Sequence, residues 1–135
     1  MDTDAGSTRA KPDGAAGGVR KRPYDLEDRT LAFARRCRAF VRRLPRTVAN
    51  AEDAKQLVRA SGSVGANYIE ANEALSKKDF RMRVKISRKE AKEARYWTRL
   101  VDLRQDASLA DDRDWIVRKA TELMNIFGAM LRNTK

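Results

Sequence analysis

The chain has 135 residues, with 30 Lys and Arg against 19 Asp and Glu, no His and one Cys, and its formal net charge is +11. This length suits one domain with a single core, and one cysteine excludes an internal disulfide framework. The lack of histidine excludes a Ser-His-Asp triad, a Cys-His pair and the common imidazole metal sites. We therefore expect a protein that is not an enzyme and that uses no cofactor or metal.

The composition also bears on partners and location. An excess of positive charge this large attracts polyanions, although it does not define a site. No apolar run approaches the roughly 20 residues of a membrane span. The first residues lack a hydrophobic signal core, which predicts a cytoplasmic protein.

Residues 1–23 form a low-complexity segment that holds four of the seven glycines and two of the three prolines. Such a segment buries too little apolar surface to offset its ordering entropy, so we expect a disordered tail before a domain over residues 24–135. The basic run Arg20-Lys21-Arg22 at its end is either a solvated tail or an extension of a polyanion-binding surface.

The first predicted helix starts at Tyr24, with Asp25 as its N-cap, and stops before Pro45. Apolar residues recur in it at helical spacing, and the later half is crowded with arginines. Cys37 is flanked by arginines, but a structural thiol is the better interpretation than a reactive one.

The second predicted helix runs from Asn50 to Leu75, and its centre, residues 60–66, consists of small side chains. Each internal glycine weakens a helix by roughly 1 kcal/mol relative to alanine, so small size must bring a compensating gain. We expect close approach of a neighbouring helix. A phosphate-binding loop is the alternative, but this segment lacks the lysine and the spacing of a P-loop.

The third predicted helix begins with Ser76 as its N-cap, paired with Asp79, and runs from Lys77 to Arg104. On a helical wheel it shows three faces. The face expected in the core holds Phe80, Val84, Ser87, Ala91, Ala94, Thr98 and Val101. A second face, which we expect to form an oligomer interface, holds Met82, Ile86, Glu93, Trp97 and Leu100. The third face is a basic stripe of Arg81, Lys85, Arg88, Lys92, Arg95 and Arg99.

The fourth predicted helix begins at Asp111-Asp112 and reaches Leu131, so four helices follow one another with short links. This order predicts an all-α, antiparallel up-down-up-down four-helix bundle. Because a surface helix of a monomer needs only one apolar face, the second face of the third helix predicts a ring-shaped homo-oligomer. The expected core residues are Phe33, Phe40, Leu57, Val64, Tyr68, Phe80, Val84, Ala91, Ile116, Leu123 and Phe127.

Two carboxylate pairs lie on helices expected to be neighbours: Glu70 with Glu73, and Glu90 with Glu93. Carboxylates on facing helices can hold two irons, but that architecture adds histidines, which this chain lacks. Ion pairing or a contact between subunits is therefore the favoured interpretation. For the adjacent Tyr96 and Trp97, packing is favoured over base stacking.

The positive charge is unevenly distributed. Residues 77–104 carry eleven Lys and Arg against four Asp and Glu, whereas residues 51–75 carry two against four. Like charges four apart in a helix repel, so an arc of six cations with no acid suggests a polyanion-binding surface, although a solvated face remains the alternative. The predicted nucleic-acid-binding residues are this basic stripe, together with Arg35, Arg38 and Arg42.

Several motifs together resemble a known family. They are Tyr24-Asp25-Leu26-Glu27, the segment 59–71 around Ser-Val-Gly-Ala-Asn-Tyr, the junction 76–80, and Lys89-Glu90-Ala91-Lys92-Glu93-Ala94-Arg95-Tyr96-Trp97. They are similar to the bacterial four-helix bundle proteins encoded within intervening sequences of 23S ribosomal RNA genes. The resemblance covers about residues 24–132 and implies a homopentamer. It also implies similarity to the accessory variability determinant of diversity-generating retroelements, which binds a reverse transcriptase and nucleic acid. The long tail and Ser87-Arg88 depart from the family pattern.

Two functions follow from these observations. The first is a non-catalytic oligomer that binds RNA or DNA through its basic stripes. The second is a protein-interaction scaffold, or an accessory subunit that docks a nucleic-acid enzyme such as a reverse transcriptase. No membrane partner is expected.

Overall fold

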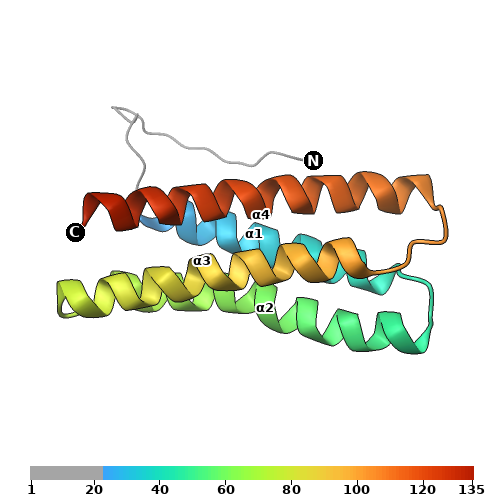
Figure 1. The fold of residues 1–135 in the computed structure, drawn as a ribbon, viewed down its shortest axis with the longest axis horizontal. Helices are drawn as coiled ribbons and strands as arrows, with labels where there is room; N and C mark the ends of the chain where they lie inside the picture. Colours follow the sequence, from blue (N-terminus) through green and yellow to red (C-terminus); the bar gives the residue numbers. More distant parts are fainter. Residues whose placement is uncertain (1–22) are drawn as a thin grey trace.

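The computed structural model describes residues 23–135, over which the chain forms four α-helices (Figure 1). They are α1 (Pro23–Arg42), α2 (Val48–Asn72), α3 (Lys77–Leu100) and α4 (Ala107–Asn133). Each helix contacts the next, and α1 contacts α4, so the four close into a bundle in which α1 and α3 are diagonal. The all-α, four-helix prediction is confirmed, with no strand in the part of the chain that the structure describes. Of the predicted tail, residues 1–22 lie outside that part.

The helix boundaries differ from the predicted ones in three places. At the first, α1 begins at Pro23, so Asp25 stands in the first turn rather than at the N-cap. Proline suits the first turn because the N–H it lacks would have no partner inside the helix. Ser76 is the N-cap of α3 as predicted, and its hydroxyl accepts a hydrogen bond from the N–H of Asp79.

The second difference concerns Asn50, which was expected to open α2. The N-cap is Thr47, whose hydroxyl accepts from the N–H of Asn50, and α2 begins at Val48. Asn50 is instead buried between the two loops at this end of the bundle. Its amide donates to the carbonyls of Pro45 (3.0 Å) and Asp102 (2.9 Å), and its side-chain oxygen accepts from the N–H of Asp102 (3.0 Å). One side chain thus joins the α1–α2 loop to the α3–α4 loop.

The third difference is at the α3–α4 connection. Helix α3 ends at Leu100 rather than at Arg104, because the chain turns away to bury Val101 and Leu103. The turn passes through left-handed backbone at Arg104 (φ 52°) and Gln105 (φ 62°). Asp106 then caps α4, its carboxylate accepting from the N–H of Leu109, so α4 begins one turn before the predicted Asp111.

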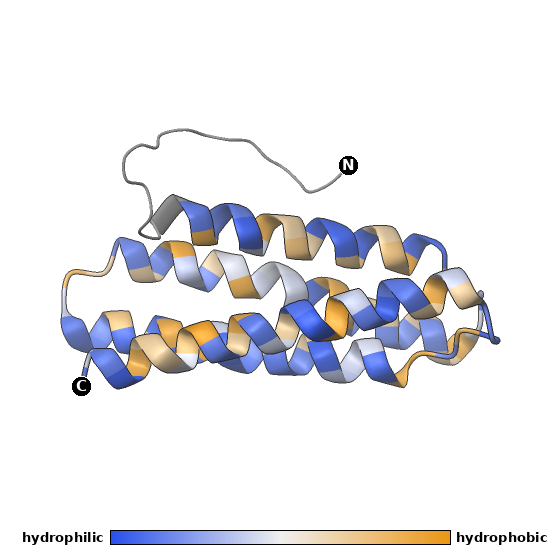
Figure 2. Ribbon diagram, turned by 90° about the horizontal axis from the view of Figure 1, so that it is seen from above, coloured by the Kyte–Doolittle hydropathy of each residue, from blue (hydrophilic) through white to orange (hydrophobic). Residues whose placement is uncertain are grey.

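The core lies along the bundle axis, where the apolar stripes of all four helices meet. Figure 2 shows apolar and polar residues alternating along each helix, as amphipathic helices require. Of the eleven predicted core residues, ten are buried. The exception is Phe80, which is only partly buried because it stands in the first turn of α3, at the end of the bundle. Truncating Phe80 should therefore destabilise the fold by less than the roughly 3–5 kcal/mol of a fully buried phenylalanine.

The small centre of α2 packs against both neighbouring helices, as predicted. A Cβ added at Gly65 would lie 2.7 Å from Oγ1 of Thr30 on α1, closer than real side chains approach. On the α3 side, the buried hydroxyl of Ser87 donates to the carbonyl of Val64 at 2.9 Å. Ser87 therefore joins α3 to α2 through a buried hydrogen bond between the helices.

Candidate nucleic-acid interface

The basic stripe of α3 lies on the side of the helix that faces α4. Two of its members are hydrogen-bonded to α4. Arg81 donates to the carbonyl of Leu131 and to the hydroxyl of Thr134, at the C-terminus of α4, where positive charge is favourable. Arg95 donates to the hydroxyl of Thr121 at 3.0 Å. The stripe therefore lies beside α4 along the length of α3.

The other four members, Lys85, Arg88, Lys92 and Arg99, are exposed. Within residues 23–135, none of the six cations of the stripe lies within ion-pair distance of a carboxylate. Cations elsewhere do have such partners: Arg36 and Arg43 both contact Asp112. Mutual repulsion along α3 is thus not offset by acids, which leaves this surface free to attract an anionic ligand.

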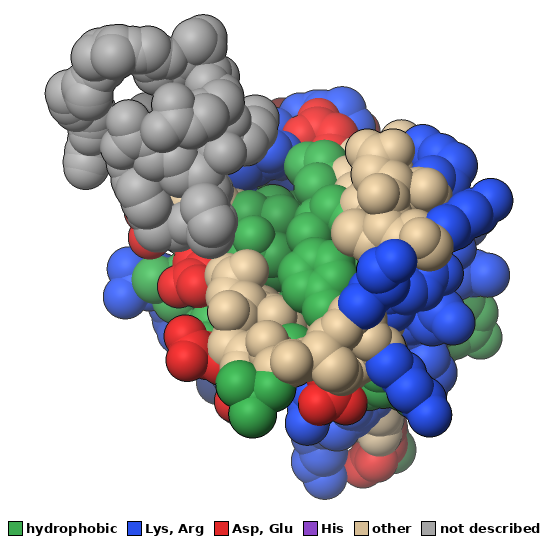
Figure 3. Space-filling model, turned by 90° about the vertical axis from the view of Figure 1, so that its left-hand side faces the viewer, with side chains coloured by type: hydrophobic (Ala, Val, Ile, Leu, Met, Phe, Trp, Pro, Cys, Tyr) green, Lys and Arg blue, Asp and Glu red, His purple; other side chains and the backbone are tan. Residues whose placement is uncertain are grey.

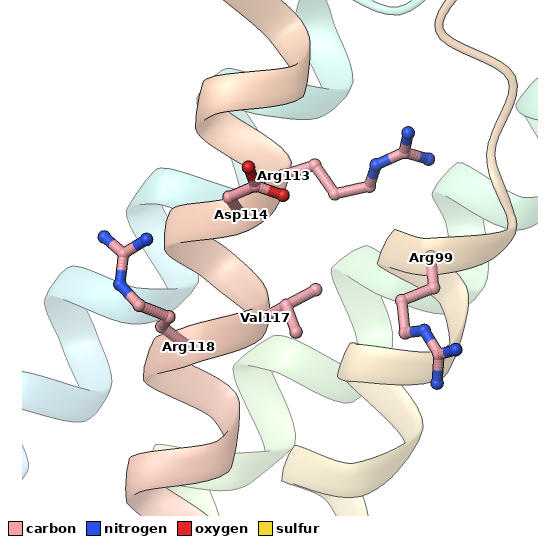
Figure 4. A pocket seen from close by; sticks show the side chains of 5 residues that line it. All are labelled: Arg99, Arg113, Asp114, Val117 and Arg118. Carbon is pink, nitrogen blue, oxygen red and sulfur yellow. The ribbon is translucent and has the colours of Figure 1, made fainter.

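A hollow lies between α3 and α4 near the end of α3 (Figure 4). It is lined by Arg99 from α3 and by Arg113, Asp114, Val117 and Arg118 from α4. In Figure 4, Arg99 and Arg113 extend on the α3 side of α4 with Val117 between the two helices, while Arg118 extends from the other side of α4. The hollow therefore has three arginines and one carboxylate, Asp114, around a small apolar floor, which leaves its lining net positive.

The α4 residues of this hollow were not among the predicted site residues. Arg113, Val117 and Thr121 recur every four residues and so share one face of α4, a signal that a wheel of the fourth helix contains. The predicted start at Asp111 placed Arg113 in the first turn, where a cation is least expected. In the structure α4 starts earlier, and Arg113 Nη1 donates to the carbonyl of Val101 at 3.4 Å. The face that borders α3 therefore begins at Arg113.

The predicted arginines of α1 do not join this surface. Because α1 is diagonal to α3, the exposed Arg35 and Arg42 lie elsewhere on the bundle. Arg38 leans over α2, with its guanidinium near Gly62. The structure therefore separates the predicted binding residues into an α3 group and an α1 group.

The predicted interface face of α3 combines exposed and half-buried side chains. Met82 and Leu100 are 54% and 50% exposed, which is high for large apolar side chains. Ile86 is partly buried, and Trp97 is partly buried against the core. Figure 3 views the molecule from the left of Figure 1, onto the end of the bundle where α4 ends and α3 begins. At this end, apolar side chains lie at the centre of the view and Lys and Arg side chains lie along its right side.

The glutamates near this face form ion pairs, the interpretation favoured over a metal site. Arg59 of α2 lies 3.5 Å from Glu90 Oε1 and 3.3 Å from Glu93 Oε1. Lys89 lies 3.9 Å from the other oxygen of Glu93. Among the described residues, no three His, Cys, Asp or Glu side chains gather as metal ligands would.

Cys37 is a structural thiol, as interpreted from the sequence. It is fully buried. Burial raises the pKa of the thiol to about 12, although a hydrogen bond with Ser61 and the nearby charge of Arg38 each act to lower it. A thiol in this environment stays protonated and is a poor nucleophile. No helix in the described part of the chain combines the length and apolar character needed to span a bilayer.

Comparison with known proteins places these features in a family. A model of the family described as 23S rRNA-intervening sequence protein matches residues 24–129. A crystal structure of a protein of unknown function from the S23 ribosomal protein family of Bacteroides thetaiotaomicron is similar, with a TM-score of 0.67 and 28% identity. The similarity covers 78% of this chain and 97% of that one. Among curated proteins, none matches this chain.

Proposed function

The chain belongs to the 23S rRNA-intervening sequence protein family, and from its α3/α4 surface we propose that it is a non-catalytic protein that binds RNA or DNA. The observation that carries the proposal is the row of four exposed cations, Lys85, Arg88, Lys92 and Arg99, which have no acidic partner in the described part of the chain. The arginines of the hollow extend the row onto α4. Phosphates are the ligands that such a row suits, since guanidinium and ammonium groups neutralise them without reading the sequence.

Binding of this kind depends strongly on salt. Each phosphate neutralised releases a condensed counterion, and the logarithm of the affinity falls with the logarithm of salt by about 0.7–0.9 per phosphate. Four cations of one subunit therefore predict a slope of about −3. An oligomer would repeat the row, and its slope would be steeper in proportion to the subunits engaged.

The test is a titration of labelled RNA and DNA against two variants with the same change of net charge. The triple variant Lys85→Glu, Arg88→Glu, Lys92→Glu reverses the α3 row. The control Arg35→Glu, Arg38→Glu, Arg42→Glu reverses the α1 group. We expect the α3 variant to lose most of its affinity for every sequence alike and to show a shallower salt slope. The α1 control should keep much more of its affinity.

Two outcomes would contradict this proposal. If the α3 variant binds as tightly as the parent at about 0.1 M salt, where the Debye length is roughly 10 Å, the row is a solvated face. If both variants lose affinity equally, net charge rather than the α3/α4 surface carries the binding. Circular dichroism of each variant shows whether the helices remain folded.

We further propose that the protein assembles as a ring-shaped homo-oligomer, specifically a homopentamer, through the exposed apolar side of α3. Met82 and Leu100 support this, because large apolar side chains that are half exposed commonly mark association surfaces. Sedimentation equilibrium of the parent and of the double variant Met82→Glu, Leu100→Glu is the test. We expect a pentamer for the parent and smaller species for the variant, with helical content retained. Trp97→Glu is a less specific test, because Trp97 also packs against the core. A parent that sediments as a 15 kDa monomer at micromolar concentration would refute this.

The second candidate function is a scaffold or accessory subunit that docks a nucleic-acid enzyme such as a reverse transcriptase. The same exposed side chains, Met82 and Leu100, favour it, because a partner protein could cover them instead of a second copy. A protein that binds neither RNA nor DNA, and whose Met82→Glu, Leu100→Glu variant keeps the parent's oligomeric state, would favour this function over the first.

A further inference from the structure

Tyr96 stands out among the aromatic side chains by its exposure. Between Asp25 and Lys135, where burial is described, it is the only aromatic residue classed as exposed, at 57%. The sequence favoured packing for Tyr96 and Trp97 together. The structure separates the two: Trp97 packs against the core, whereas most of Tyr96 remains accessible.

The ring of Tyr96 has a defined position despite its exposure. Tyr96 and Trp97 form an edge-to-face pair, with ring centroids 5.1 Å apart and planes at 80°. Edge-to-face contacts of this kind are favourable, and Trp97 is itself held by the core. A ligand that stacks on Tyr96 would therefore meet a ring that is already oriented, and would lose little side-chain entropy in binding it.

Two of the four residues beside Tyr96 on the surface of α3 belong to the basic stripe, and the other two are Leu100 and the ion-paired Glu93. Lys92 lies four residues before it and Arg99 three residues after it, and both are exposed. Residues at these spacings are adjacent on a helix surface, about 5–6 Å apart between Cβ atoms. Arg99 also lines the α3/α4 hollow. An exposed aromatic ring with cations along one flank is an arrangement that binds single-stranded nucleic acids, with phosphates on the cations and a base on the ring.

We propose that the ligand of the α3/α4 surface is single-stranded nucleic acid, with one base stacked on Tyr96 and adjoining phosphates on Lys92 and Arg99. This inference rests on the proposed function. A duplex keeps the faces of its bases stacked inside, so it could use the cations but not the ring.

The test compares three ligands of equal length: a single strand, the same strand with abasic sites, and a duplex. Tyr96→Leu removes the aromatic face, and Tyr96→Phe keeps it without the hydroxyl. Stacking on aromatic rings typically contributes about 1–3 kcal/mol per base, so Tyr96→Leu should bind the single strand roughly 5- to 150-fold more weakly. Tyr96→Phe should bind it like the parent. Neither variant should change the affinity for the abasic strand, which carries the same charge.

Three results would overturn the inference while leaving the proposed function intact. They are equal affinity of the parent for the intact and abasic strands, a preference for duplex, and equal losses for Tyr96→Leu on the intact and abasic strands. Sedimentation of the same variants adds a fourth: if Tyr96→Leu changes the oligomeric state, the ring is a subunit contact. The proposed function itself fails differently, by the parent showing no salt-dependent binding to any of the three ligands.

Discussion

The two glycines at the centre of α2 allow a sharp test of the packing between α1 and α2. A Cβ at Gly65 would lie 2.7 Å from Thr30 Oγ1 and 3.1 Å from Thr30 Cβ, whereas a Cβ at Gly62 would meet only the guanidinium of Arg38, at 3.6 Å. Thr30 cannot move aside easily, because it is 1% exposed and its hydroxyl donates to the carbonyl of Glu27 at 2.8 Å. The flexible Arg38 can move aside. We therefore expect alanine to fit at Gly62 without strain and to clash with Thr30 at Gly65.

The magnitude follows from two opposing contributions. Replacing glycine with alanine inside a helix stabilises it by roughly 1 kcal/mol, and this gain is common to both positions. Overpacking a filled core typically costs about 1–3 kcal/mol, and only Gly65→Ala should incur it. We expect Gly62→Ala to stabilise the protein by up to about 1 kcal/mol. Gly65→Ala should lie about 1–3 kcal/mol below Gly62→Ala, the difference due to packing alone.

Urea unfolding followed by far-UV circular dichroism measures this difference, provided that both variants show the same dependence on urea concentration. A double variant, Gly65→Ala with Thr30→Ala, should recover part of the loss, because it removes the hydroxyl but keeps the Cβ at 3.1 Å. Equal unfolding midpoints for Gly62→Ala and Gly65→Ala would refute the reasoning. So would a double variant whose two effects simply add.

Three further predictions concern single side chains. Asn50→Ala should lower the free energy of unfolding by about 1.5–4 kcal/mol in urea unfolding, because the three hydrogen bonds of a buried side chain are lost; the exposed control Asn125→Ala should not lower it to this extent. Cys37 should resist thiol reagents at about pH 8 in the native protein and react after unfolding. Labelling of the native protein at the rate of the unfolded protein would contradict this. Since the pKa of Cys37 rises from 9.0 to about 12 on folding, its contribution to stability should be constant below pH 9 and fall as the pH rises toward 12. The hydrogen bond from the Leu109 N–H lowers the pKa of Asp106. In thermal unfolding, Asp106→Ala should therefore be less stable than the parent above about pH 4, and this difference in stability should disappear as the pH falls through the lowered pKa. A difference in stability that does not depend on pH would contradict this.

The sequence predicts the helices and the core well because both depend on local periodicity. The cap at Ser76 and the apolar stripes are repeated patterns within single segments, and each has one straightforward structural solution. Asn50 was assigned wrongly because an asparagine side chain serves equally well as a helix cap or as a bridge to another loop. Only the meeting of two loops far apart in the sequence decides between them.

The candidate site depends on relations that periodicity cannot supply. A wheel of α3 separates the basic stripe from the apolar faces, but it does not say which helix the stripe will border. The register between α3 and α4 brings Arg113 beside Arg99, and the diagonal placement of α1 separates Arg35 and Arg42 from both. Tyr96 and Trp97 are adjacent in sequence and alike in chemistry, so a difference of one position around the helix decides which one stays exposed.

The bridge at Asn50 makes the two ends of the bundle unequal in how readily they open. At that end two loops are hydrogen-bonded to each other, whereas at the other end lie the start of α1, the end of α4 and a turn with Leu75 99% exposed (Figure 1). Local opening begins where buried contacts are few, so amide exchange should be fastest near Leu75 and slowest toward the bridged end. The end of α3 that carries Tyr96 and Arg99 belongs to the slow end. A ligand bound there would contact the part of the fold that opens least, so its binding would require little further ordering of the protein.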